Sequence, residues 1–76
     1  MTWDEWGNTG HPKLIFYRPN GVDAMGAIRS REPHMYTCLV LRNINLLSGF
    51  EESSVKRTEE EAKRYVEALV ALEHGI

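Results

Sequence analysis

Hydrophobic and polar positions change their spacing once along this chain, from short strand-like runs to a helical pattern. The runs 13–18 and 35–42 are rich in apolar and aromatic side chains, and the run 22–31 between them alternates. Consecutive strands joined by short turns pair antiparallel. The sequence therefore predicts an α+β fold, in which a three- to four-stranded antiparallel sheet over residues 13–50 packs against one C-terminal amphipathic helix.

The alternating run 22–31 predicts the second strand of this sheet. Asn20 and Gly21 before it predict a hairpin turn, and Pro33 after it predicts a second turn. Small side chains on one face indicate close packing beneath a helix. That face carries Ala24, Gly26, Ile28 and Ser30, and the other carries Met25, Ala27, Arg29 and Arg31.

Residues 44–50 allow two interpretations. Ile44, Leu46 and Leu47 suit either a fourth strand or an irregular apolar cover, and Gly49 suits a bulge or bend. The polar stretch 51–57 that follows predicts a loop.

Residues 58–74 predict the one long helix. Thr58 and Glu61 form a capping box, and the glutamates of the first turn suit the positive end of the helix dipole. Gly75, followed by an apolar residue, is typical of a Schellman end. The stripe expected to face the core consists of Ala62, Tyr65, Val66, Leu69, Leu72 and Ile76.

Residues 1–12 predict an N-terminal arm, because closely spaced glycines and a proline leave room for little more than one turn. Trp3 and Trp6 on this arm have two interpretations. They could fold back and cover an open side of a thin core, which we favour, or they could anchor a protein partner, since tryptophan is enriched at interface hot spots.

A chain of 76 residues with 42% hydrophobic and 26% charged residues suits one folded domain, residues 1–76, with a thin core. Its single cysteine, Cys38, excludes an internal disulfide and lies in a run that predicts burial. No secretory or membrane-spanning pattern occurs. We expect a cytoplasmic protein that does not enter membranes and needs no cofactor.

Charge is unevenly distributed, although the net charge is only −2. Residues 11–43 hold five Lys or Arg against two acidic residues, and residues 44–76 hold seven Glu against four Lys or Arg. The predicted sheet is therefore basic and the predicted helix acidic, which favours either pairing between the layers or two faces of opposite sign.

No catalytic or metal-binding motif is visible. His11, His34 and His74 lack ligand spacing, and the glycines do not form a phosphate-binding cluster. The adjacent carboxylates are explained by capping or solvation rather than by an acid–base pair. The sequence favours a non-enzymatic role.

Two resemblances bear on that role. Three strands and a C-terminal helix, with Gly49, Phe50, Thr58, Glu59, Glu60, Glu61, Ala62 and Tyr65 as the matching residues, resemble the AP2 and integrase-arm type of DNA-binding domain. This resemblance implies a sheet that enters the major groove. In size and segregated charge the chain also resembles accessory and inhibitor proteins of bacteriophages, including anti-CRISPR proteins.

We expect a protein-binding module that docks to a larger partner and could block it. The expected contact residues are Trp3, Trp6, Arg18, Arg29, Arg31, Arg42, Glu60 and Glu67. The alternative is a nucleic-acid-binding module that uses the arginine-bearing sheet, with Tyr17 and Tyr36 available for base stacking. A homodimer could form through a free strand edge at 13–18 or at the third strand.

Overall fold

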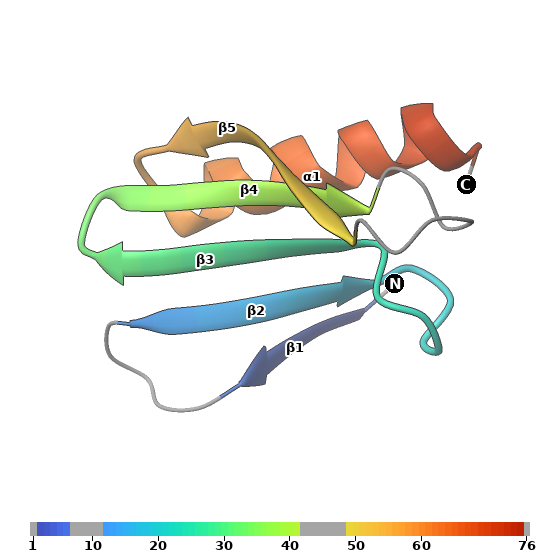
Figure 1. Cartoon of the computed structure of the whole chain (residues 1–76), viewed down its shortest axis with the longest axis horizontal. Coiled ribbons are helices and arrows are strands. Elements are labelled where there is room, and N and C mark those ends of the chain that lie inside the picture. The colour runs from blue at the N-terminus through green and yellow to red at the C-terminus, as the bar shows by residue number, and fades with distance from the viewer. Residues whose placement is uncertain (1, 7–11, 42–48, 76) are drawn as a thin grey trace.

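Five antiparallel strands and one helix make up the part of the chain that the computed structural model describes, residues 2–6, 12–41 and 49–75, with the backbone alone at positions 2, 5 and 6. The strands follow one another in space in chain order, and the helix comes last (Figure 1). The elements are β1 (Thr2–Trp6), β2 (Lys13–Arg18), β3 (Gly26–Glu32), β4 (Met35–Leu41), β5 (Phe50–Lys56) and α1 (Glu59–His74).

The predicted class, an antiparallel sheet packed against one C-terminal helix, is confirmed, and the sheet has one strand more than the upper prediction. Two assignments were wrong. Part of the predicted arm is β1, because its five residues pair in register with β2. The predicted loop 51–57 is largely β5, which pairs with β4. The possible strand at Ile44, Leu46 and Leu47 lies outside the described residues.

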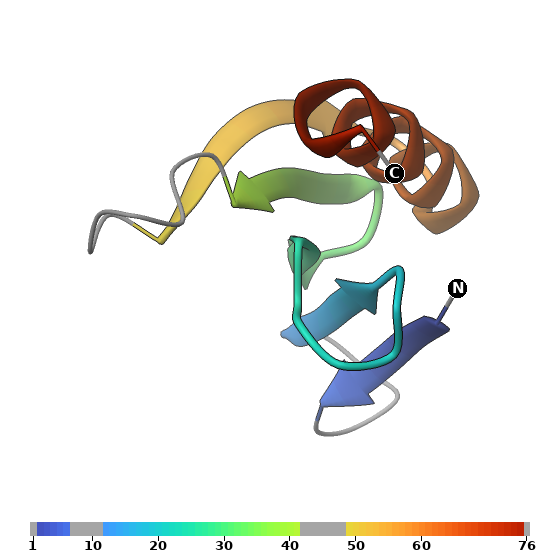
Figure 2. The ribbon, with the colours of Figure 1, turned by 90° about the vertical axis from the view of Figure 1, so that its right-hand side faces the viewer.

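The helix packs on one face of the sheet, chiefly over β3 and β4 (Figure 2). Its start is as predicted, since the Thr58 side chain accepts a hydrogen bond from the Glu61 amide. At its end, Gly75 has a left-handed backbone and donates its N–H to the Ala71 carbonyl. The Schellman contact of Ile76 lies outside the described residues. The described helix is too short and too polar to cross a membrane.

Small side chains let α1 approach the sheet closely, as the sequence predicts. A Cβ added at Gly26 would clash with a Val66 methyl carbon. The predicted stripe was partly wrong, because Leu72 is 80% exposed. The helix residues that are fully buried against the sheet are the smaller Ala62, Val66 and Val70. The cluster beneath α1 consists of Tyr17, Ile28, Cys38, Val40, Ala62, Val66 and Val70, with Trp3, Met25, Tyr36, Tyr65 and Leu69 against it.

The connections confirm one turn and correct the other. Pro33 and His34 form the tight turn between β3 and β4, where His34 adopts a positive φ of 64°. The Asn20–Gly21 turn closes with a hydrogen bond from the Gly21 amide to the Arg18 carbonyl. The chain does not return at once as a hairpin, because Asn20 also accepts hydrogen bonds from the amides of residues 22 and 23 and holds a wider loop.

Within the described residues, the strands at the two edges of the sheet are β1 and β5. The strands at 13–18 and 35–41, where the sequence analysis expected free edges, are therefore interior. Each pairs with a neighbour on both sides because the segments taken for an arm and a loop are strands.

Candidate partner-binding surface

The face of the sheet opposite α1 carries no described element, and we call it the open face (Figure 2). Strand side chains alternate between faces, so the neighbours of core residues such as Ile28 and Cys38 point to it. Its residues are Leu14, Phe16 and Arg18 of β2, Ala27, Arg29 and Arg31 of β3, Met35, Thr37, Leu39 and Leu41 of β4, and Phe50, Glu52 and Val55 of β5.

One end of the open face is apolar and closed over by side chains. The rings of Phe16 and Phe50 meet with centroids 6.1 Å apart, although their strands are not neighbours. Figure 1 shows the reason, because β5 crosses diagonally in front of β4 and brings its start toward β3. Ala27 and Leu39 are consequently buried without help from the helix. This end serves as a second small core.

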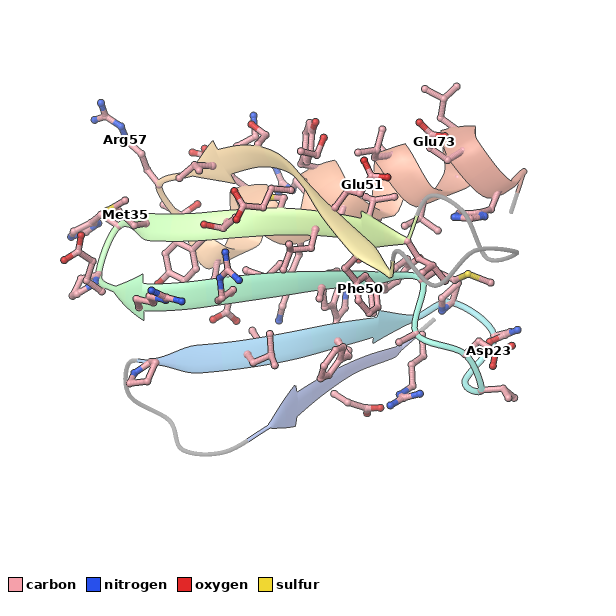
Figure 3. All side chains as sticks on the ribbon, viewed as in Figure 1. Asp23, Met35, Phe50, Glu51, Arg57 and Glu73 are labelled. Carbon is pink, nitrogen blue, oxygen red and sulfur yellow. The ribbon has the colours of Figure 1, made fainter. Side chains whose placement is uncertain are left out.

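The other end of the open face is hollowed and charged. A hollow of about 450 Å³ is lined by Arg29, Arg31, Glu32, Met35, Thr37 and Glu52. A second hollow of about 270 Å³, lined by Pro12, Lys13, Leu14, Arg29 and Arg31, lies on the other side of the same two arginines. Figure 3 shows Met35 at this end of the sheet, beside the turn between β3 and β4. Together these residues form what we call the arginine hollow.

The two arginines of the hollow differ in their partners. An Nη atom of Arg29 lies 2.7 Å from a carboxylate oxygen of Glu52, with both side chains well exposed. Arg31 is exposed, and no ion pair or hydrogen bond of its side chain occurs within the described part of the chain. An apolar side chain lines the same hollow, since Met35 is 47% exposed.

Of the other two arginines expected at the contact, Arg18 does not lie at this hollow. Arg18 lies toward the far end of β2, where its Nε is 2.6 Å from Asp4 and an Nη donates to the Val22 carbonyl. Arg42 lies outside the described residues. The predicted neighbours for base stacking are on the wrong face, because Tyr17 and Tyr36 pack into the cluster under α1.

Trp3 packs against the protein's own core. Its ring stacks on Tyr17 with centroids 4.8 Å apart, and its indole N–H donates to a Glu67 carboxylate oxygen at 2.8 Å. The Lys63 ammonium lies 5.7 Å from the centre of the same ring. This geometry matches the interpretation of Trp3 as a cover for the core. The side chain of Trp6 lies outside the described structure.

The two acidic helix residues expected at the contact have different environments. Glu60 pairs with Arg64 one turn later, and both side chains are largely exposed. Glu67 accepts the hydrogen bond from Trp3. Burial of Tyr17 raises the pKa of its hydroxyl, and the negative charge of Glu67 raises it further. The helix is joined to β2 by a third glutamate, Glu59, whose carboxylate lies 2.8 Å from the Lys13 ammonium.

The remaining candidates for chemistry have structural environments. Cys38 is fully buried, as predicted, and burial raises the pKa of its thiol to about 11, with Lys56 lowering it in part. His74 bonds to the Leu41 carbonyl at 2.6 Å and so ties the helix end to β4. Among the described residues, no three His, Cys, Asp or Glu side chains are grouped to hold a metal ion.

Of the residues that line the arginine hollow, sequence reasoning identified only Arg29 and Arg31 as contact residues and missed the others, Met35 and Glu52 among them. Glu52 was assigned to a loop, as was Val55, because the stretch 51–57 is polar. The pairing of β4 with β5 also shifts register at Ser53, which interrupts the alternation of faces. A strand with such a bulge does not show a regular alternation of hydrophobic and polar residues.

Comparisons with family models, with curated proteins and with solved structures returned no match.

Proposed function

We propose that this protein is a non-enzymatic binding module that docks to a larger protein through the arginine hollow. The observation that carries the proposal is the exposed Arg31 beside the exposed Met35, in a hollow of about 450 Å³ on a face that no described element covers. Interfaces are enriched in arginine and methionine, which combine charge with apolar contact area. Binding a partner at such a site needs no catalytic residue.

The chemistry of the hollow indicates what the partner presents. Arg29 is already paired with Glu52, so the charged side chains of the 450 Å³ hollow that have no partner within the described part are Arg31 and Glu32. A partner segment that carries a carboxylate next to an apolar side chain would match Arg31 and Met35 together. The planar guanidinium suits bidentate binding of such a carboxylate.

Nucleic-acid binding is the alternative, and the geometry supports it less well. Phosphate contacts need several free cations, whereas Arg18 and Arg29 are paired with Asp4 and Glu52. Base stacking needs exposed rings near the cations, whereas Tyr17 is buried under the helix. Binding to DNA or RNA that weakens steeply with salt would favour this alternative.

Docking can also inhibit, because occupying a partner's working surface is enough to block it. We extend the proposal to this case, in line with the resemblance in size and charge to phage accessory and inhibitor proteins. Adding the purified protein to its purified partner should then lower the partner's activity in proportion to the bound fraction.

The test is affinity purification followed by binding measurements with the purified partner. Arg31→Glu and Met35→Asp should each weaken binding at least tenfold, which corresponds to about 1.4 kcal/mol. The matched control is Leu72→Asp, which changes an even more exposed apolar residue on the helix. Equal binding by all variants, or loss only with Leu72→Asp, would refute docking through the arginine hollow.

A further inference from the structure

The free edge of β5 offers a second interaction surface, separate from the arginine hollow. Strand β5 ends the sheet, and the backbone groups on its outer side meet no other strand in the described part of the chain. Such an edge is a template for pairing with a further strand. The question is which strand it fits.

Charges are segregated along β5. Glu51 and Glu52 stand near its start, and Lys56 ends it with Arg57 directly after. Figure 3 shows Glu51 and Arg57 well separated along the strand, with Arg57 projecting beyond the sheet. In an antiparallel pair, the start of one strand meets the end of the other. A second copy of β5 therefore brings acidic residues opposite basic ones.

The bulge decides which residues would meet. Ser54 lies opposite Cys38 and Glu52 lies opposite Leu39, so Ser53 is the extra residue. The Ser53 hydroxyl is 2.6 Å from the Tyr65 hydroxyl on the helix side, and Ser54 shares that side because it is paired with buried Cys38. Both serines therefore point to the helix side, and the alternation of faces along β5 resumes on either side of them.

This arrangement sets the faces of the charged residues. Glu51 lies opposite the core residue Val40, and the Lys56 ammonium lies 4.6 Å from the centre of the Tyr65 ring, so both are on the helix side. Val55, which is paired with Thr37, is on the open face, as is Glu52.

A two-fold axis between Ser53 and Ser54 would then pair each residue of β5 with a residue of the second copy that points to the same face of the sheet. On the helix side it would place Glu51 of each copy opposite Lys56 of the other. It would also place Glu52 opposite Val55 of the second copy, twice, on the open face. Residues directly opposite in a sheet must share a face, and opposite charges there are stabilising.

We infer that the protein forms a two-fold dimer through β5, with a continuous antiparallel sheet across both copies. The other edge does not fit a second copy in this way, because the sequence of β1 holds Asp4 and Glu5 and no Lys or Arg. Pairing of β1 with itself would oppose like charges. The dimer would place both arginine hollows on the same side of the joint sheet, since a two-fold axis perpendicular to a sheet preserves its faces.

Charge reversal tests the inference on the full chain. Sedimentation velocity over a range of concentrations should show dimers for the natural sequence. Glu51→Lys and Lys56→Glu should each weaken association at least tenfold, because each creates two like-charge pairs across the axis. An equimolar mixture of the two variants should associate again, since both pairs are then opposite in charge.

The mixing step separates this result from misfolding, because two unfolded variants would not restore each other. The matched control is Asp23→Lys, which makes the same charge change in the exposed loop between β2 and β3 and should leave association unchanged. In the natural sequence, exchange of the β5 amide hydrogens should also slow as the protein concentration rises. A natural sequence that stays monomeric throughout, or variants whose mixture fails to associate, would overturn the inference.

Discussion

The two faces of the sheet differ in what their side chains do. On the helix-covered face, Ile28, Cys38, Val40 and Val66 are almost completely buried, and no buried side-chain nitrogen or oxygen of the described residues lacks a hydrogen-bond partner. On the open face, charged and apolar side chains stand half exposed around a hollow. The difference indicates that the helix-covered face supplies most of the stability and that the hollowed end of the open face is available for contact with partners.

The largest expected effect separates the two faces directly. Ile28→Ala should lower the free energy of unfolding by about 2–5 kcal/mol, because it empties a fully buried site under α1. A domain of this size has roughly 3–5 kcal/mol of net stability, so a large fraction of the variant should be unfolded even without denaturant. Val55→Ala on the open face should change stability by less than about 0.5 kcal/mol. Urea unfolding followed by circular dichroism measures both, and similar losses would contradict the division between the faces.

A smaller effect tests how the N-terminal strand is held to the covered face. Trp3→Phe keeps a ring against Tyr17 but removes the donor to Glu67, and we expect a loss of about 1 kcal/mol. Glu67→Gln and the double variant complete a thermodynamic cycle. If the two single losses simply add, the hydrogen bond contributes nothing, and β1 is held by packing and strand pairing alone.

The smallest expected effect depends on pH. The hydrogen bond from Lys13 holds the pKa of Glu59 below its usual value of 4.5, opposed by partial burial and helped by Lys63. A lowered pKa in the folded state means that the ionised carboxylate stabilises the fold above the unfolded-state pKa, and that this contribution is lost as the pH falls through the lowered value. Glu59→Gln should therefore cost about 1 kcal/mol or less at pH 7, and this cost should disappear as the pH falls through the lowered pKa.

Glu60→Gln is the matched control for this experiment, because its carboxylate pairs with Arg64 on the exposed side of the helix. Urea unfolding at a series of pH values should show a smaller difference for the control. A Glu59→Gln penalty that persists unchanged at low pH would show that the carboxylate charge is not its source.

Much of the fold follows from local patterns in the sequence. The helix from 59 to 74, its threonine cap and its glycine end were predictable because capping is a short-range interaction. The interior strands 13–18 and 35–41 were predictable because strands with neighbours on both sides are apolar or aromatic along their length. The close approach of the helix over Gly26 was visible in the small residues of one strand face.

The two edge strands could not be predicted in the same way. The residues of β1 are mostly polar or aromatic and precede a series of chain breakers, so that only pairing with β2 makes them a strand. The alternation of β5 is interrupted by its bulge at Ser53. Edge strands bury little of their surface, and their hydrophobic signal is correspondingly weak.

The candidate site shows the same limit. Arg29 and Arg31 were identified from their alternation on one strand, which is a local property. Their apolar neighbour Met35 was not, because it joins them only through the pairing of β3 with β4.

The sequence by itself determined the class of fold, the helix with both its ends, the buried Cys38 and the face on which the two arginines of β3 stand, since each depends on residues a few positions apart. Tertiary structure decided which segments are the edges of the sheet, which helix residues touch it, and which cations are left with no partner among the described residues. The physical reason is that these properties depend on pairing and burial between distant segments, where the contribution of one residue is fixed by neighbours that lie far from it along the chain.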